Sequence, residues 1–203
     1  MRKVDPAKHE EKRREILEAA GRCFARSGFH GATTSAICAE AKISPGHLFH
    51  YFDSKEAMIA AITQARLDDA MVRTERVMES ADPFGTFVNG IKDALLTKGR
   101  MNNPLLLDML AEARHNPTMA EIVQESTRQG QAVVAAFLRK GQEEGRVDTN
   151  LDPELAAAIV ISVIDGSQSI AVRDPKLDKE ESGKLLLKML LRLFAPPAAA
   201  DGA

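Results

Sequence analysis

The stretch TTSAICAEAKISPGHLFHY, residues 33–51, predicts two short helices joined by a tight turn. The first helix is expected from Thr34 to Ala41 and the second from Pro45 to Tyr51, with Lys42 and Ile43 between them. Ser44 stands directly before the second helix, where its hydroxyl can accept a hydrogen bond from a free N–H of the first turn. Apolar residues are spaced to form one small shared core: Ile37, Ala41, Ile43, Leu48 and Phe52.

The same spacing directs a second set of side chains away from that core: Ser44, Pro45, Gly46, His47, His50 and Tyr51. A helix that opens with small and polar residues can enter the major groove of B-DNA, where the base edges of the four base pairs differ. The N–H groups at helix starts suit phosphate oxygens. The stretch therefore indicates a helix-turn-helix that binds duplex DNA.

Proline positions extend the helical prediction to the whole chain. Six of the nine prolines follow a residue that caps helices well: Asp5, Ser44, Asp82, Asn103, Asn116 and Asp152. Proline suits the next position because its missing N–H would lack a partner there in any case. Further starts are predicted at Thr33 or Thr34, at Ser54, and at Asp178, which forms a capping box with Glu181. The sequence thus predicts an all-α chain of about nine helices.

The apolar pattern gives the expected organisation. The first helix should end at Gly28, and a long helix should end near residues 141–145. Residues 153–171 and 179–194 predict two further, unusually apolar helices. We expect a DNA-binding domain at residues 9–59 and a larger helical domain for ligand sensing and dimerisation at residues 60–196.

Composition limits the classes of protein. Hydrophobic residues make up 44% of 203, enough for a substantial core. No apolar run approaches the roughly 20 residues of a membrane span, and no signal peptide is recognisable, so we expect a cytoplasmic protein without membrane contact. The net charge is −2, but residues 1–60 hold ten Lys or Arg against eight Asp or Glu, and four of the five histidines. Cys23 and Cys38 occupy apolar helical positions and are expected to be buried free thiols.

The segment ILEAAGRCFARSGFHGATTSAICAEAKISPGHLFHYFDSKEAMIAAI, residues 16–62, resembles the DNA-binding domain of the TetR family of transcriptional regulators. The resemblance implies that Thr33 or Thr34 caps the first helix of the motif and touches phosphate. It implies that Ser44, Pro45 and Gly46 lie against the groove, and that His47 contacts a base edge. His50, Tyr51 and Lys55 would hold the DNA backbone. Lys42 stands where the family usually has glycine, and Phe49 where it usually has tyrosine.

The remaining two-thirds resembles the family less closely. AEARHNPTMAEI, EEGRVDTNLDPELAA and VIDGSQSIAV are similar to the sensing domain of one broad subgroup, mostly repressors. A hydrophobic effector is expected, because methionine and aromatic side chains can line an adaptable apolar cavity. The candidate ligand-binding residues are Met71, Phe84, Phe87, Met101, Met109, Glu112, His115, Phe137, Asp165 and Gln168.

The last two helices carry more apolar surface than a monomer needs. Two such helices from each of two subunits would build a four-helix interface in a homodimer. The expected interface residues are Leu155, Ile159, Val163, Gly166, Ile170, Leu186, Met189, Leu190, Leu193 and Phe194.

The resulting hypothesis is a homodimeric regulator, a repressor that leaves a palindromic operator when a small molecule binds. No catalytic motif is present, so no catalytic residue or cofactor is expected. His47 and His50 could hold a metal by their spacing, but no carboxylate or thiol follows at the distance of a zinc site, so no metal is expected. Two alternatives stay open, an all-α enzyme using His47, His50 or Glu112, and a helical scaffold that binds only proteins.

Overall fold

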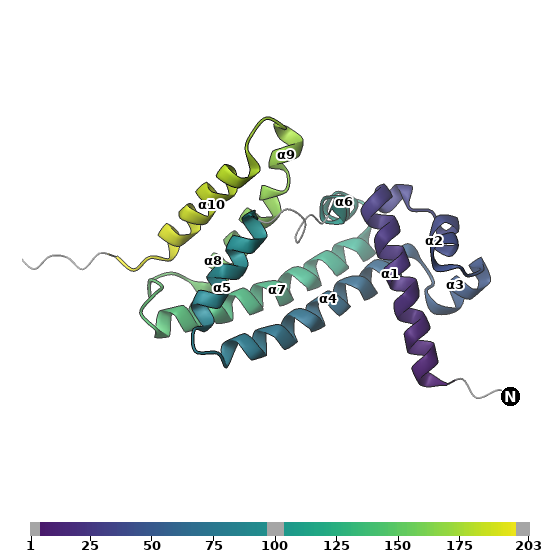
Figure 1. Cartoon of the computed structure of the whole chain (residues 1–203), viewed down its shortest axis with the longest axis horizontal. Helices are drawn as coiled ribbons and strands as arrows, with labels where there is room; N and C mark the ends of the chain where they lie inside the picture. Colours follow the sequence, from purple (N-terminus) through teal and green to yellow (C-terminus); the bar gives the residue numbers. More distant parts are fainter. Residues whose placement is uncertain (1–4, 97–103, 198–203) are drawn as a thin grey trace, which may run out of the picture. The chain divides into compact units, whose positions relative to one another are not determined.

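The computed structural model describes residues 5–96 and 104–197, and within them it contains only helices (Figure 1). The prediction of an all-α chain is confirmed. The elements are α1 (Pro6–Gly31), α2 (Thr34–Ala41), α3 (Pro45–Tyr51), α4 (Lys55–Met78), α5 (Pro83–Leu96), α6 (Pro104–Glu112), α7 (Pro117–Glu143), α8 (Pro153–Ser167), α9 (Ile170–Arg173) and α10 (Lys179–Phe194).

Six helices begin at the prolines that the sequence marked as helix starts. The capping side chains act as expected. The Asp5 carboxylate accepts a hydrogen bond from the Ala7 N–H (3.1 Å), and the Asp152 carboxylate accepts one from the Glu154 N–H (2.9 Å). Asp178 accepts from the Glu181 N–H at 2.9 Å. Local cap chemistry therefore sets where these helices start.

The expectation of one helix over residues 153–171 is wrong. The structure ends α8 at Ser167 and begins the one-turn α9 at Ile170. Hydroxyl groups compete with the helical hydrogen bonds here, since Ser167 Oγ donates to the Ile164 carbonyl (2.6 Å) and Ser169 Oγ donates to the Gly166 carbonyl (2.7 Å). Glycine and serine are also weak helix formers, so the helix breaks at this point.

The chain divides into two compact units. The first comprises the described residues up to Asp68 together with 104–126, and the second comprises the described residues of 69–96 and 127–197. Helices α4 and α7 each begin in the first unit and end in the second. Within the described residues, no helix is long and apolar enough to cross a membrane.

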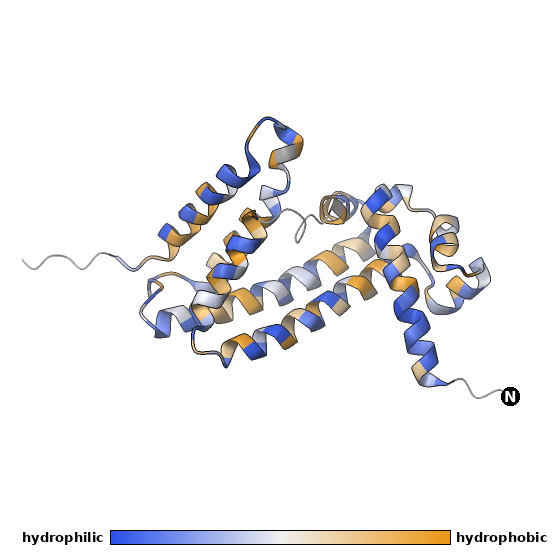
Figure 2. Ribbon diagram, in the orientation of Figure 1, coloured by the Kyte–Doolittle hydropathy of each residue, from blue (hydrophilic) through white to orange (hydrophobic). Residues whose placement is uncertain are grey.

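The core of the first unit joins α1, α2, α3 and α4 to α6 and the start of α7. Phe24, Ile37, Leu48 and Met58 are fully buried in it, and Met119 of α7 is equally buried. Cys23 and Cys38 lie in the same core as free thiols, as predicted, and burial raises the pKa of Cys38. The polar N-terminal half of α1 is visible in Figure 2 as the hydrophilic end of that helix.

The core of the second unit joins α5, the later part of α7, α8 and α10. Its buried centre includes Phe84, Leu138, Val160 and Leu190. Helices α5 and α10 approach closely at Gly183, where an added Cβ atom would lie 2.6 Å from the Leu95 carbonyl oxygen. A larger residue at this position would force the two backbones apart.

The turn between α2 and α3 contains the one residue other than glycine with a left-handed backbone among the described residues. Lys42 has φ 53° and ψ 47°, and its N–H is shared between the Ala39 and Cys38 carbonyls. An L-residue in this region costs roughly 1–2 kcal/mol because its Cβ crowds the carbonyl oxygen. Lys42 is exposed, so no burial of its side chain offsets that cost.

We predict that Lys42→Gly raises the free energy of unfolding by about 1 kcal/mol, because glycine adopts this conformation without the Cβ clash. Chemical denaturation measures the change. Lys42→Ala is the matched control, since it removes the same charge but keeps a Cβ atom. Equal stabilisation by the two variants would show that charge, and not backbone strain, is the cause.

Candidate DNA interface

Helices α2 and α3 form the expected helix-turn-helix, and each is held by its own capping side chain. The Thr33 hydroxyl accepts a hydrogen bond from the Ala36 N–H (3.1 Å), and the Ser44 hydroxyl accepts one from the His47 N–H (3.2 Å). The turn closes with the Ile43 N–H on the Cys38 carbonyl at 3.0 Å. These local bonds fix the start of α3, so its first turn has a defined direction.

One side of α3 is buried and the other is exposed. Leu48 has no exposed surface and Phe52 keeps 4%, while Ser44, Pro45, Gly46, His47 and His50 are exposed. Phe49 is 49% exposed. An added Cβ at Gly46 would meet no atom within 4 Å, so no packing in the described chain requires glycine there. The absence of a side chain instead keeps the first turn of α3 open to an approaching molecule.

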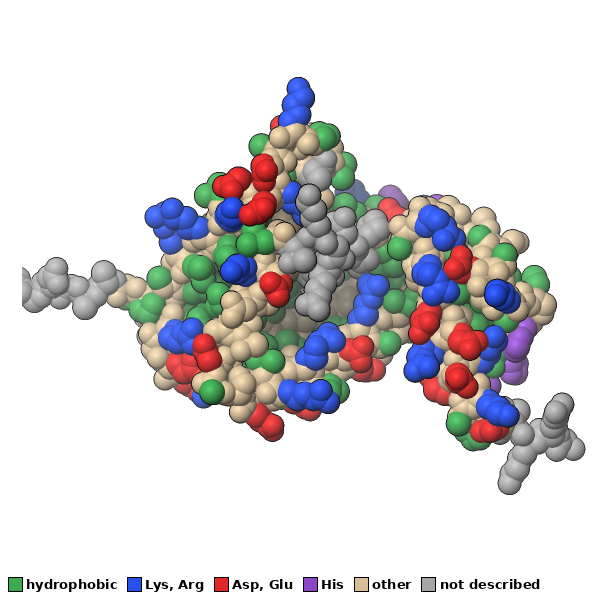
Figure 3. All heavy atoms as spheres, in the orientation of Figure 1, with side chains coloured by type: hydrophobic (Ala, Val, Ile, Leu, Met, Phe, Trp, Pro, Cys, Tyr) green, Lys and Arg blue, Asp and Glu red, His purple; other side chains and the backbone are tan. Residues whose placement is uncertain are grey.

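A cluster of rings follows this exposed side. Tyr51 is half-buried, and the rings of His47 and His50 each lie 5.4 Å from it. His9 of α1 stacks on Tyr51 with ring centroids 4.6 Å apart. Histidine side chains can be seen on the surface of the first unit beside α3 in Figure 3. His9 was not predicted as a site residue, although the concentration of histidines in the first 60 residues was a signal.

Ion pairs attach α2 to α1. Arg22 Nε lies 2.9 Å from one Glu40 oxygen, and an Arg26 nitrogen lies 3.3 Å from the other. The two guanidinium groups lower the pKa of Glu40. These positioning contacts were also not predicted, because they join residues 14 and 18 positions apart on different helices.

Lys55 is half-buried, and its ammonium is engaged by the bend of α1. Its ammonium donates a hydrogen bond to the Phe29 carbonyl oxygen (2.8 Å) and lies 4.5 Å from the centre of the Phe29 ring. The N–H of Phe29 is bound by the Asp108 carboxylate of α6 at 3.0 Å. We call Gly28, Phe29, Lys55 and Asp108 the Phe29 clamp. The phosphate contact of Lys55 stays a prediction, and it would use the remaining N–H groups of the ammonium.

The candidate ligand residues of the first unit lie on α6 and in the turn that follows it. Glu112 lies 2.8 Å from His30 Nε2 and accepts a hydrogen bond from the Asn116 amide (3.3 Å), which also bonds Glu56 (3.2 Å). Met109 is 4% exposed and belongs to the core. His115 is exposed.

Three of the candidate ligand residues of the second unit, Phe84, Phe87 and Phe137, form one cluster of aromatic rings. Phe84 and Phe137 are each 5% exposed, and Phe87 stacks on Phe137 with ring centroids 5.0 Å apart. Asp165 is half-buried, and burial raises its pKa. Gln168 is half-buried, while Met71 is 48% exposed. Met101 lies outside the described residues. The ligand-binding roles of all these residues stay predictions.

The expected dimer residues differ in how much of their surface is exposed. Leu190 and Phe194 lie in the core of the second unit with 0% and 2% exposed surface, so they have almost no surface to offer a partner and their expected role is corrected. Gly166 and four large apolar residues are exposed: Leu155, Ile159, Met189 and Leu193. Val163, Ile170 and Leu186 are half-buried. The apolar surface thus remains substantial without the two corrected residues.

No group of three or more histidine, cysteine or acidic residues comes together as a metal site in the described part of the chain. The exposed α3 surface with its capped first turn has the shape and chemistry of a helix that reads duplex DNA.

Comparison with known proteins identifies the family. Residues 16–62 match the model of the tetR family of bacterial regulatory proteins, and residues 94–195, half of the chain, match the C-terminal domain of BetI-type transcriptional repressors. The chain therefore belongs to the TetR family and is a helix-turn-helix transcriptional regulator. The family expected from the sequence is confirmed.

Individual proteins agree with this assignment. The transcriptional regulator UidR of Escherichia coli K12 is 29% identical over 154 residues, covering 76% of this chain and 78% of UidR. The repressor AcnR of Corynebacterium efficiens is 27% identical over 76% of this chain and 78% of its own. Among solved structures, Salmonella enterica GusR superposes with a TM-score of 0.74 at 27% identity, covering 91% of this chain and 95% of GusR. The alternatives of an enzyme or a protein-binding scaffold are not favoured by these matches.

We predict that His47→Ala relaxes the preference for one or two base pairs in each half of the DNA site, at roughly 1–3 kcal/mol for a good base contact. Selection from random duplexes followed by sequencing measures the preference. His115→Ala is the control, because His115 is an exposed histidine of the same unit in the turn between α6 and α7. An unchanged motif with His47→Ala would remove His47 from the list of base-reading residues.

Proposed function

We propose that this regulator is a repressor that binds a palindromic operator as a homodimer and releases it when a small hydrophobic molecule binds. The observation that carries the proposal is the capped and exposed first turn of α3, with Gly46 open to solvent and His47 directly behind it. Thr33, Ser44, His50 and Tyr51 supply polar groups around that turn. A function on DNA agrees with the expected cytoplasmic location, which stays a prediction.

Exposed apolar residues on α8 and α10 support the homodimer. Leu155 and Ile159 are one turn apart on α8, and they are 63% and 43% exposed. Leu185, Met189 and Leu193 repeat every four residues on α10, with exposures of 68%, 47% and 38%. Burying such stripes contributes about 25 cal/mol for each Å² of apolar surface removed from water. A second copy of the same surface would cover them with twofold symmetry.

The Phe29 clamp supports a route for release. Helices α4 and α6 both hold the Phe29 peptide, which directly follows the bend of α1 and precedes α2. A ligand that favours a different position of α6 or α4 would therefore move the start of α2. The ligand must bind the DNA-incompetent state more tightly, since equal affinity for both states shifts nothing.

We predict that selection from random duplexes returns an inverted repeat whose half-sites lie about 34–36 Å apart, or a multiple of that distance.

Met189→Glu should give a monomer, because it places a charge in the apolar dimer stripe. Its affinity for the full operator should fall about 100-fold or more, because the second half-site no longer assists binding. Light scattering and operator titration measure the two effects.

Leu191→Glu is the matched control for the dimer, since Leu191 is 41% exposed on the same helix but points away from the stripe. It should stay dimeric and keep its operator affinity. A dimeric Met189→Glu protein would place the subunit interface elsewhere, and the absence of any enriched motif would refute the proposed DNA function.

We predict that hydrophobic or aromatic compounds which raise the melting temperature also weaken operator binding by roughly 5- to 150-fold, the range of typical couplings. Asp108→Ala should still bind these compounds but should lose most of this coupling, because the Phe29 N–H no longer has its carboxylate partner. Asp93→Ala, at an exposed aspartate of α5, is the control. A full response in Asp108→Ala would mean that the signal does not pass through the clamp.

A further inference from the structure

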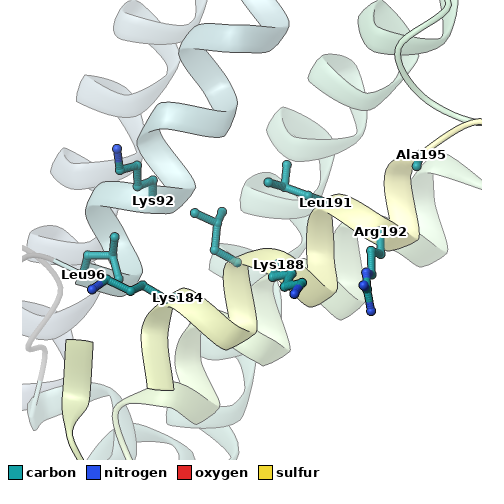
Figure 4. Close-up of a pocket in the computed structure, with 8 residues that line it drawn as sticks. Lys92, Leu96, Lys184, Lys188, Leu191, Arg192 and Ala195 are labelled. Carbon is teal, nitrogen blue, oxygen red and sulfur yellow. The ribbon is translucent and has the colours of Figure 1, made fainter. Parts of the chain in front are cut away.

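A groove of about 420 Å³ runs between α5 and α10 in the second unit (Figure 4). It begins beside Gly183, where the two helices touch, and continues along α10 from Lys184 to Ala195. Eleven helical steps of 1.5 Å make this stretch about 16 Å long, which is three turns of a helix. The groove is open to the surface and is not a closed cavity.

The wall of the groove is almost entirely apolar. Leu96 of α5 and Leu187 and Leu191 of α10 contribute to it, and the hydrocarbon chains of the lysines and the arginine can extend it. Leu187 rests on the core of the second unit, whereas Leu191 is 41% exposed. An apolar strip of this kind would gain free energy from being covered.

Positive charges border both sides of this strip. Lys92 stands on α5, and Lys188 and Arg192 stand one turn apart on α10, as Figure 4 shows. None of these three forms an ion pair within residues 5–96 and 104–197. Lys184 differs, because Glu180 and Glu181 hold its ammonium at 2.9 and 2.8 Å. Unpaired cations around an apolar strip are complementary to an acidic partner, although the whole chain carries a net charge of −2.

The groove lies on a different face of α10 from the proposed dimer stripe. At 100° per residue, Leu191 is turned about 160° from Met189, counted the shorter way round the helix. A partner that covers Leu185, Met189 and Leu193 therefore leaves Leu187 and Leu191 uncovered. Lys188 lies about 60° from Leu185 and Arg192 about 60° from Met189, between the stripe and the two leucines, so Leu187 and Leu191 remain accessible in the proposed homodimer.

We propose that this groove binds an amphipathic helix of a partner protein, with leucine-like residues in the strip and glutamate or aspartate residues beside Lys92, Lys188 and Arg192. The length of the groove matches three helical turns. The spacing of Lys188 and Arg192, about 6 Å along the axis, matches acidic residues at positions i and i+4 of a helix lying alongside.

Two other occupants fit less well. A fatty acid has one anionic group and would leave two of the three cations without a partner, and an open groove would leave much of its chain in water. An anionic membrane surface lying along α10 would also meet Glu180 and Glu181 in the first turn of that helix. A helix can place its acidic side chains selectively, so it avoids both problems.

The test uses the full-length protein and a fluorescent 18-residue helical peptide with leucines along one face and glutamates at i and i+4 beside them. Anisotropy should show saturable binding that weakens with salt. The double variant Lys188→Glu with Arg192→Glu should lower affinity at least tenfold. The same variant should bind a peptide in which lysines replace the glutamates, which shows that the groove still folds. Lys176→Glu, an exposed cation of the same unit outside the groove, should bind the original peptide normally.

Several results would overturn the proposal. The proposal fails if a peptide with the same composition in scrambled order binds with the same affinity. It also fails if Lys176→Glu lowers the affinity for the original peptide as much as the double variant does, or if the double variant does not bind the lysine peptide. Binding of phosphatidylserine vesicles or of laurate that depends on Lys188 and Arg192, without peptide binding, would replace the helix by a lipid. Operator affinity of the double variant is measured in parallel and should be unchanged. A loss of peptide binding is thereby distinguished from a loss of DNA binding.

Discussion

The backbone N–H and C=O groups of Phe29 tie the bend of α1 to α4 and α6. The N–H is bound by Asp108 of α6 and the carbonyl oxygen by Lys55 of α4, and both bonds involve a charged group. Gly28, with φ 69°, turns the chain so that both groups are presented, and an added Cβ there would collide with the Asp108 carboxylate. Hydrogen bonds to charged groups contribute about 1.5–3 kcal/mol each. Helix α2 begins five residues later, at Thr34, so its position depends on these two hydrogen bonds.

Charge and aromatic contacts extend this support to the surface of the DNA-binding helix. Glu40 joins α2 to two arginines of α1, and His9 stacks on Tyr51 at the end of α3. Helix α3 has only seven residues and could not remain helical alone. Its stability comes from Leu48 beneath it, the Ser44 cap before it and the packing of Tyr51 against α1. These contacts hold the helix while leaving the side chains of Pro45, His47 and His50 exposed.

Features that depend on neighbours in sequence could be predicted, and features that depend on distant pairing could not. Helix starts follow from a cap and a proline, so the bounds of α2 and α3 were predicted residue by residue. The strained conformation of Lys42 followed from its place in the turn. The pairs Lys55–Phe29 and Asp108–Phe29 span 26 and 79 residues, and no local pattern reports them. Methionine and phenylalanine spacing likewise could not distinguish a cavity lining from the core that contains Met109 and Phe84.

The position of residues 104–126 has a practical consequence for protein engineering. The DNA-binding unit takes Asp108, Met109 and Met119 from a part of the chain that follows the helix-turn-helix by more than 50 residues. A fragment that stops after α4 would lack three buried members of the core of the first unit, Leu105, Met109 and Met119, and would leave the Phe29 N–H without its acceptor. Chimaeras that transplant this DNA specificity to another sensor therefore need α6 and the first turns of α7 as well. The DNA specificity can be transferred only together with these later helices, and not as the N-terminal segment alone.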